Sequence, residues 1–68
     1  MINFAKRIKE LRTEKGLTQT DVANFLNIKQ QSYARYENDT AEPSLEMVVK
    51  LAAFFNVTCD YLLGVSDI

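Results

Sequence analysis

The strongest constraint on the fold is that residues which stop helices cut one helical pattern into five short segments. Phe4, Ile8 and Leu11 are spaced as on one helix face, and Gly16 follows them as a stop signal. Asn27 tolerates the left-handed conformation and ends a second segment. Further segments are expected at about 30–38, 45–55 and 59–63, the last stopped by Gly64. The pattern predicts a compact all-α domain of five short helices.

Polar residues at the starts of these segments support the same division. Thr18 with Asp21 three residues later has the form of a capping box. Pro43 followed by Ser44 marks the start of the fourth segment, and Thr58 that of the fifth. The fourth segment is apolar on nearly every side, so we expect it to be the central buried helix.

The length of the chain allows a single domain, over residues 1–68, near the lower limit for folding without cross-links. Such a core rarely leaves more than about 3–5 kcal/mol of net stability. The one cysteine, Cys59, cannot form an internal disulfide, and we expect it to be a small buried hydrophobic residue and not a redox site. No secretory leader and no apolar run of about 18 residues is evident, which predicts a cytoplasmic protein without a membrane span.

The absence of histidine argues against an enzyme and against a metal centre. Histidine is the commonest general base and metal ligand, and a lone cysteine cannot build a zinc site. No cluster of acids and no nucleophile–base pair is evident either. We therefore expect no catalytic activity, no metal and no cofactor.

Charge is distributed unevenly although the net charge is only −1. Residues 1–38 hold seven basic and four acidic side chains, whereas residues 39–68 hold one basic and five acidic ones. A strongly basic domain is the usual mark of a nucleic-acid partner, and this chain is not one. The polarity nevertheless permits a basic contact face on a nearly neutral protein.

The third segment has two distinct faces when its residues are placed about 100° apart. Tyr33 and Tyr36 occupy one side and are expected to anchor the helix. The other side is small, amide-rich and cationic, and it holds Gln30, Gln31, Ala34, Arg35 and Asn38. Such a face suits a DNA major groove, although the same residues also make an ordinary solvated surface.

The context of this segment favours DNA. A short helix precedes it through a turn of about three residues, which is the helix-turn-helix connection. In that motif the amino-terminal end of the second helix enters the groove, and the glutamines lie at that end.

The chain resembles a known protein family. The stretches TQTDVANFLNIKQQSYARYEN and PSLEMVVKLAAFFNVTCDYLLG look like the helix-turn-helix domain of phage repressors and Cro proteins, the XRE family. The resemblance runs from about Phe4 to Gly64. It implies a helix-turn-helix at about residues 18–38, with a recognition helix at about 30–38.

Individual roles follow from the resemblance. It implies base contacts from Gln30, Gln31, Ala34 and Arg35, and phosphate contacts from Gln19, Lys29, Asn38 and Lys9. Gln19 would also brace Gln30. Arg12 matches the position that forms a structural ion pair with Glu37. Lys29 stands where the family has a capping Ser or Thr and cannot accept helix N–H bonds.

The chain also departs from the family pattern. Asp39-Thr40-Ala41-Glu42 replaces the glycine and basic residues that usually follow Asn38, which should weaken phosphate binding. Phe25, Val49 and Ala53 are apolar where relatives are polar. Two interpretations of these residues remain open. They either enlarge the core, which we favour slightly for Phe25, or form a surface for a protein partner.

Two functions remain open at this stage. The first is a sequence-specific DNA-binding transcriptional regulator, a repressor, bound as a homodimer to an inverted-repeat operator. The resemblance places its dimer interface at Val57, Thr58, Tyr61 and Leu62. The alternative is a protein-interaction module on the same fold, such as an antitoxin-like or anti-repressor-binding subunit.

Overall fold

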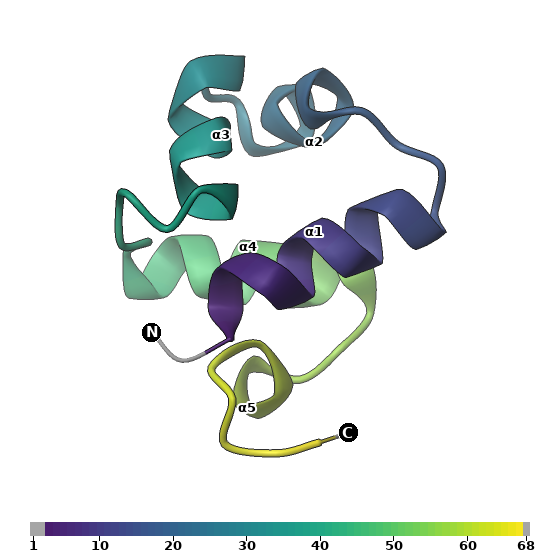
Figure 1. Ribbon diagram of the computed structural model, residues 1–68, viewed down its shortest axis with the longest axis vertical. Coiled ribbons are helices and arrows are strands. Elements are labelled where there is room, and N and C mark those ends of the chain that lie inside the picture. Colours follow the sequence, from purple (N-terminus) through teal and green to yellow (C-terminus); the bar gives the residue numbers. More distant parts are fainter. Residues whose placement is uncertain (1–2, 68) are drawn as a thin grey trace.

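The computed structural model describes residues 3–67; the first two residues and the last residue of the predicted domain lie outside this range. Within it the chain forms helices and no strands, which confirms the all-α class. The helices are α1 (Phe4–Glu14), α2 (Gln19–Leu26), α3 (Gln30–Glu37), α4 (Leu45–Phe55) and α5 (Cys59–Leu62). In Figure 1, α2 and α3 lie above α1 and α4, and α5 lies below them.

The predicted helix starts are present as side-chain caps. The Thr18 hydroxyl accepts a bond from the Asp21 backbone N–H at 3.1 Å, and the Asp21 carboxylate accepts one from the Thr18 N–H at 2.8 Å. Ser44 and Thr58 accept the corresponding bonds at the starts of α4 and α5. These bonds satisfy N–H groups that have no partner inside a helix.

All five helices in the described range end in the same way, with one residue in the left-handed conformation. Gly16, Asn27, Asp39, Asn56 and Gly64 have φ between 57° and 80°. The N–H of the residue after each of them bonds a carbonyl five residues back, as in the Schellman motif. The chain therefore reverses sharply after each helix, and only two of the five turns use glycine.

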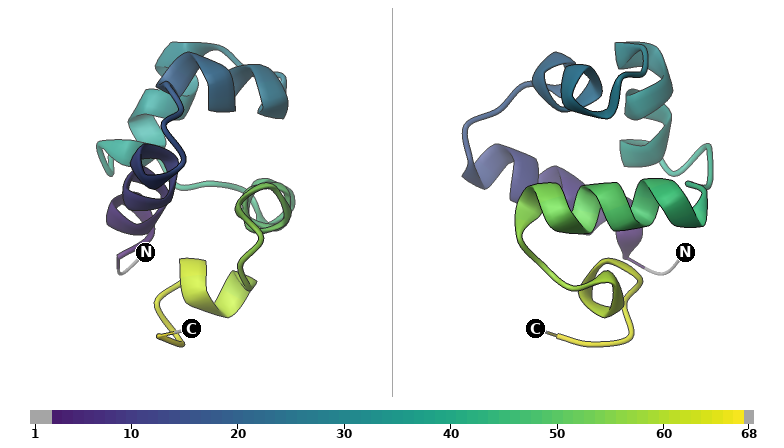
Figure 2. Two further views of the ribbon diagram at one scale, coloured as in Figure 1. Left: turned by 90° about the vertical axis from the view of Figure 1, so that its right-hand side faces the viewer. Right: turned by 180° about the vertical axis from the view of Figure 1, so that it is seen from behind.

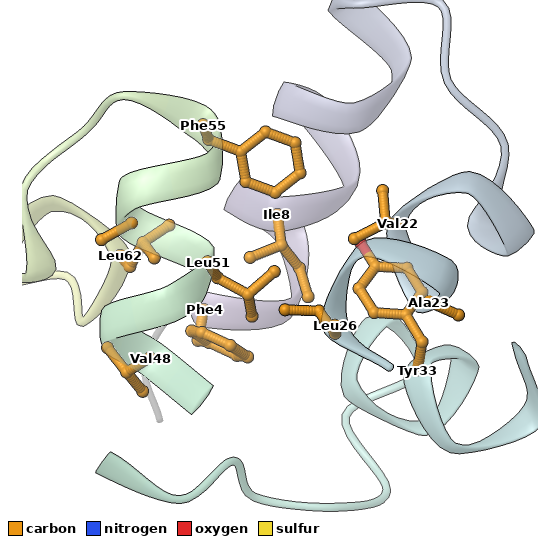
Figure 3. Close-up of a cluster of buried hydrophobic side chains, with 11 residues drawn as sticks. Phe4, Ile8, Val22, Ala23, Leu26, Tyr33, Val48, Leu51, Phe55 and Leu62 are labelled. Atoms are coloured by element: carbon orange, nitrogen blue, oxygen red, sulfur yellow. The ribbon is translucent and has the colours of Figure 1, made fainter. Parts of the chain in front are cut away.

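One core joins all five helices. Phe4 and Ile8 come from α1, while Leu62 comes from α5, and Figure 3 shows them directed toward the same interior. The remaining buried apolar residues are Val22, Ala23, Leu26, Tyr33, Val48, Leu51, Ala52 and Phe55. Tyr33 is the member contributed by α3, so the predicted anchoring of that helix by an inward tyrosine is present.

Three expectations about burial are wrong. Phe25 does not enlarge the core, because it is 54% exposed and stacks on Phe54 at a ring distance of 4.3 Å. Helix α4 is not buried on nearly every side, because Leu45 and Val49 are exposed on its outer surface. Figure 2 shows α4 at one side of the molecule in the left view and in front of α1 in the right view. Leu62, expected at an interface, is fully buried in the chain's own core.

Within residues 3–67, no helix combines the length and the apolar character needed to span a lipid bilayer.

Candidate nucleic-acid interface

The outer face of α3 is polar, exposed and without carboxylates. Gln30, Gln31, Arg35 and Asn38 are exposed, and Ala34 is half-buried between them. Lys29 caps the helix only with its backbone, because its side chain makes no capping bond. The residues predicted to read bases are thus brought together on one face, and the first turn keeps N–H groups without side-chain caps.

The inner face of α3 is held by aromatic rings. Tyr33 is fully buried, and Tyr36 meets it edge-on at 6.4 Å between ring centres. The Tyr33 hydroxyl lies next to the Glu37 carboxylate without a hydrogen bond of ordinary geometry. Burial raises the pKa of Tyr33 far above its usual value, so the phenol stays neutral. Rotation of α3 about its own axis would expose this large side chain.

A two-pronged ion pair joins α1 to the end of α3. Arg12 Nε donates to Glu37 Oε2 at 2.6 Å, and Arg12 Nη2 donates to Glu37 Oε1 at 3.1 Å. Arg12 Nη1 also donates to the Leu17 carbonyl at 2.8 Å. The exposed fractions of the two side chains are 13% for Arg12 and 1% for Glu37. This is the pair that the family resemblance implied.

Two amides connect the ion pair to the outer face of α3. Gln19 Nε2 donates to Glu37 Oε1 at 3.1 Å, and Gln30 Nε2 donates to Gln19 Oε1 at 2.6 Å. The expected bond between Gln19 and Gln30 is therefore present. The bond between Gln19 and Glu37 was missed, because nothing in the sequence indicates that these two side chains, on different helices, meet.

The Glu37 carboxylate remains ionised in this setting. Burial by itself would raise the pKa of Glu37, but hydrogen bonds from Arg12 and Gln19 and the charge of Arg12 outweigh it. The net effect is a pKa below the ordinary glutamate value. An ionised carboxylate accepts hydrogen bonds and donates none, which fixes the direction of every bond made to it.

The basic side chains differ in how far they are free. Lys9 and Lys29 are exposed, as is the neutral amide of Asn38, and no hydrogen bond or ion pair within residues 3–67 holds these three side chains. Arg7 is committed elsewhere: it donates to the carbonyls of Tyr61 and Ser66 and lies over the Tyr61 ring at 4.3 Å. Arg7 therefore fastens the segment after α5 and is a poor candidate for a phosphate contact.

The predicted dimer residues are only partly available. Thr58 is exposed, and Val57 and Tyr61 are half-buried. Leu62 must be removed from this set, because its side chain is 0% exposed. The helical period explains the error: α5 has four residues, so one of its apolar side chains has to face inward to attach the helix.

The buried pair gives a direct stability prediction. Glu37→Ala should lower the free energy of unfolding by about 3–5 kcal/mol, because the Arg12 charge stays desolvated without a partner. Replacing both residues by methionine should cost much less. Glu46→Ala is the matched control: it breaks the exposed pair with Lys50, 3.4 Å apart, and should cost under about 1 kcal/mol. Because the whole domain is expected to have only about 3–5 kcal/mol of stability, Glu37→Ala should be largely unfolded without urea, as circular dichroism would show. Urea unfolding compares the native chain, the double methionine variant and Glu46→Ala, and a Glu37→Ala protein as stable as Glu46→Ala would contradict the assignment.

The same pair predicts a dependence of stability on pH. Because the pKa of Glu37 is lower in the folded state, its contribution is complete above the unfolded glutamate pKa and is lost as the pH falls through the folded one. The native chain should therefore lose more unfolding free energy on acidification below about pH 5 than Glu37→Gln does. Parallel curves for the two proteins would show that Glu37 has no lowered pKa.

Comparisons with known proteins agree with this geometry. A family model described as helix-turn-helix matches residues 8–62. A transcriptional regulator from Listeria innocua has a similar structure, with a TM-score of 0.85 and 31% identity over 90% of this chain and 57% of that one.

Two relatives show the same likeness in sequence. The chain is 37% identical to the HTH-type transcriptional regulator ImmR of Bacillus subtilis, over 98% of this chain and 53% of the relative. It is 39% identical to the cryptic phage CTXphi transcriptional repressor RstR of Vibrio cholerae, over 94% and 58%. The chain thus spans a little over half the length of these relatives. It belongs to the helix-turn-helix family of the phage repressor and Cro type.

Proposed function

We propose that this chain is a sequence-specific DNA-binding transcriptional regulator that represses by binding an inverted-repeat operator as a homodimer. The observation that carries the proposal is the outer face of α3. Its amide and guanidinium groups are exposed together, and the helix beneath them is fixed by Tyr33 and the ion pair. The names of the relatives, a transcriptional regulator and a phage repressor, support the same function.

Direct reading would come from the first two turns of α3. A glutamine amide can bond adenine through two hydrogen bonds, and an arginine can do the same with guanine. Gln30, Gln31 and Arg35 are the residues of these types on the face. Ala34, half-buried between them, would lie against a thymine methyl group.

Attraction to the phosphate backbone would come from isolated lysines. Lys9 and Lys29 are exposed and free, and Gln19 and Asn38 would add contacts at the edges of the interface. Asp39 and Glu42 oppose this attraction from the turn after α3. We therefore expect modest affinity that falls steeply with salt concentration.

Dimerisation would place two copies of α3 in successive major grooves about 34 Å apart. Val57, Thr58 and Tyr61 are the surface candidates for the contact between subunits. Repression in the cytoplasm would then be steric, because the bound dimer covers promoter DNA.

The proposal predicts different effects for side chains that contact bases and for side chains that attract phosphates. Gln31→Ala should relax the base preference at one position of each half-site, by about 1–3 kcal/mol. Lys9→Ala should weaken binding to all sequences alike and reduce the dependence on salt. Titration of operator and scrambled duplexes at about 50 and 200 mM salt measures both. Identical behaviour of the two variants on every sequence would contradict base reading by Gln31.

A second candidate function is a protein-interaction module, favoured by exposed apolar residues that the family pattern does not require. Val49 is 58% exposed, and Ala53 lies one turn further along the same side of α4. Phe25 lies apart from them, against Phe54 on the side of α4 that meets α2. A relative with a matching name is the antitoxin PezA of Streptococcus pneumoniae, 37% identical over 90% of this chain and 39% of that protein.

The second candidate function is tested by substitutions in α4 of the whole chain. A tagged chain purified from its own host should retain a stoichiometric protein partner, and Val49→Lys should lose it. Lys50→Gln, on the adjacent exposed position, should keep it. Retention by Val49→Lys, or no partner together with specific DNA retardation, would reject this candidate in favour of the first.

A further inference from the structure

The chain of hydrogen bonds from Arg12 to Gln30 has a direction that its chemistry imposes. A carboxylate offers acceptors only, so Gln19 has to turn its NH₂ group toward Glu37. The Gln19 carbonyl oxygen then points the other way, where it accepts the NH₂ group of Gln30 at 2.6 Å. The placement of nitrogen and oxygen in both amides thus follows from the charge at the buried end.

This direction decides what Gln30 offers to solvent. One of its N–H groups is bound to Gln19, so the free carbonyl oxygen and the second N–H remain. One acceptor and one donor match adenine, which presents an N7 acceptor and an N6 donor in the major groove. A reversed amide would bond Gln19 through its oxygen, which keeps one lone pair beside that bond, and would direct the NH₂ group with its two donors outward. Two donors match guanine, which presents the acceptors N7 and O6.

We propose that ionised Glu37, acting through Gln19, is a positioning residue that makes Gln30 select adenine over guanine. The inference rests on the proposed DNA-reading function and deepens it, because it gives a buried residue a part in base selection. Arg12 contributes by holding both carboxylate oxygens, which keeps the acceptor character of Glu37. A purely structural Glu37 would affect folding and leave the base preference unchanged.

Glu37→Gln is the discriminating variant, because it keeps the shape and replaces one acceptor by a donor. The introduced amide would keep its oxygen for the shorter bond from Arg12 Nε and place its NH₂ group where Oε1 lies, facing Gln19 and also Arg12 Nη2. An NH₂ group at that position would reverse both glutamines, and replacing Arg12 by methionine as well would remove the opposing donor. Gln19→Met removes the middle of the chain at similar size, so Gln30 would become free to rotate. Combining the two substitutions completes a double-mutant cycle.

The readout is the base preference of each protein, obtained by selection from a randomised duplex pool and deep sequencing. The native chain should prefer adenine over guanine by about fivefold or more at the Gln30 position. Glu37→Gln should reverse or abolish this preference, and Gln19→Met should abolish it. In the Gln19→Met background, Glu37→Gln should change the preference no further. The preference at the Gln31 position should persist throughout.

Loss of folding is separated from loss of positioning by a second variant. Arg12→Met combined with Glu37→Gln leaves no unpaired buried charge, and circular dichroism verifies its fold. It should also lose the adenine preference. An unchanged preference in either Glu37 variant, or the same shift with and without Gln19, overturns the inference alone. Failure of the native chain to enrich any sequence overturns the proposed function together with it.

Discussion

The bidentate pair between Arg12 and Glu37 is the interaction on which the position of α3 and its outer face depends. It joins α1 to the last turn of α3, beside the half-buried ring of Tyr36. Tyr33 fixes the middle of the helix, and Gln19 connects the pair to its first turn. Three contacts of different kinds therefore define the position of one eight-residue helix.

Much of the fold could be predicted because short-range chemistry determines it. Caps such as Thr18 and Ser44 act within three residues, so their signals are visible in the sequence. The ends of the third and fourth segments were predicted at about residues 38 and 55, close to the observed ends. Asp39 and Asn56 were not predicted as the left-handed residues of these turns, although Asn27 was. Asp39 takes this conformation without being a glycine, and the N–H of Thr40 still bonds the Arg35 carbonyl, so the turn after α3 is complete.

The candidate site was predictable to the extent that helical periodicity governs it. The outward direction of Gln31 and Arg35 follows from the period of one helix. Burial at helix edges does not, because it depends on how neighbouring helices cross. For this reason Phe25 and Val49 proved exposed and Leu62 buried. The bond from Gln19 to Glu37 likewise required the spatial relation of α2 to α3.

The central claim, that the outer face of α3 reads bases, is tested most directly by side-chain amide NMR. The ¹⁵N-labelled protein would be titrated with its selected duplex and with a scrambled duplex of equal length. The NH₂ resonances of Gln30 and Gln31 should move with the selected duplex and not with the scrambled one, while those of Asn24 and Asn56 stay unchanged. Stationary glutamine signals, with changes confined to α4 and α5, would contradict this account of the molecule.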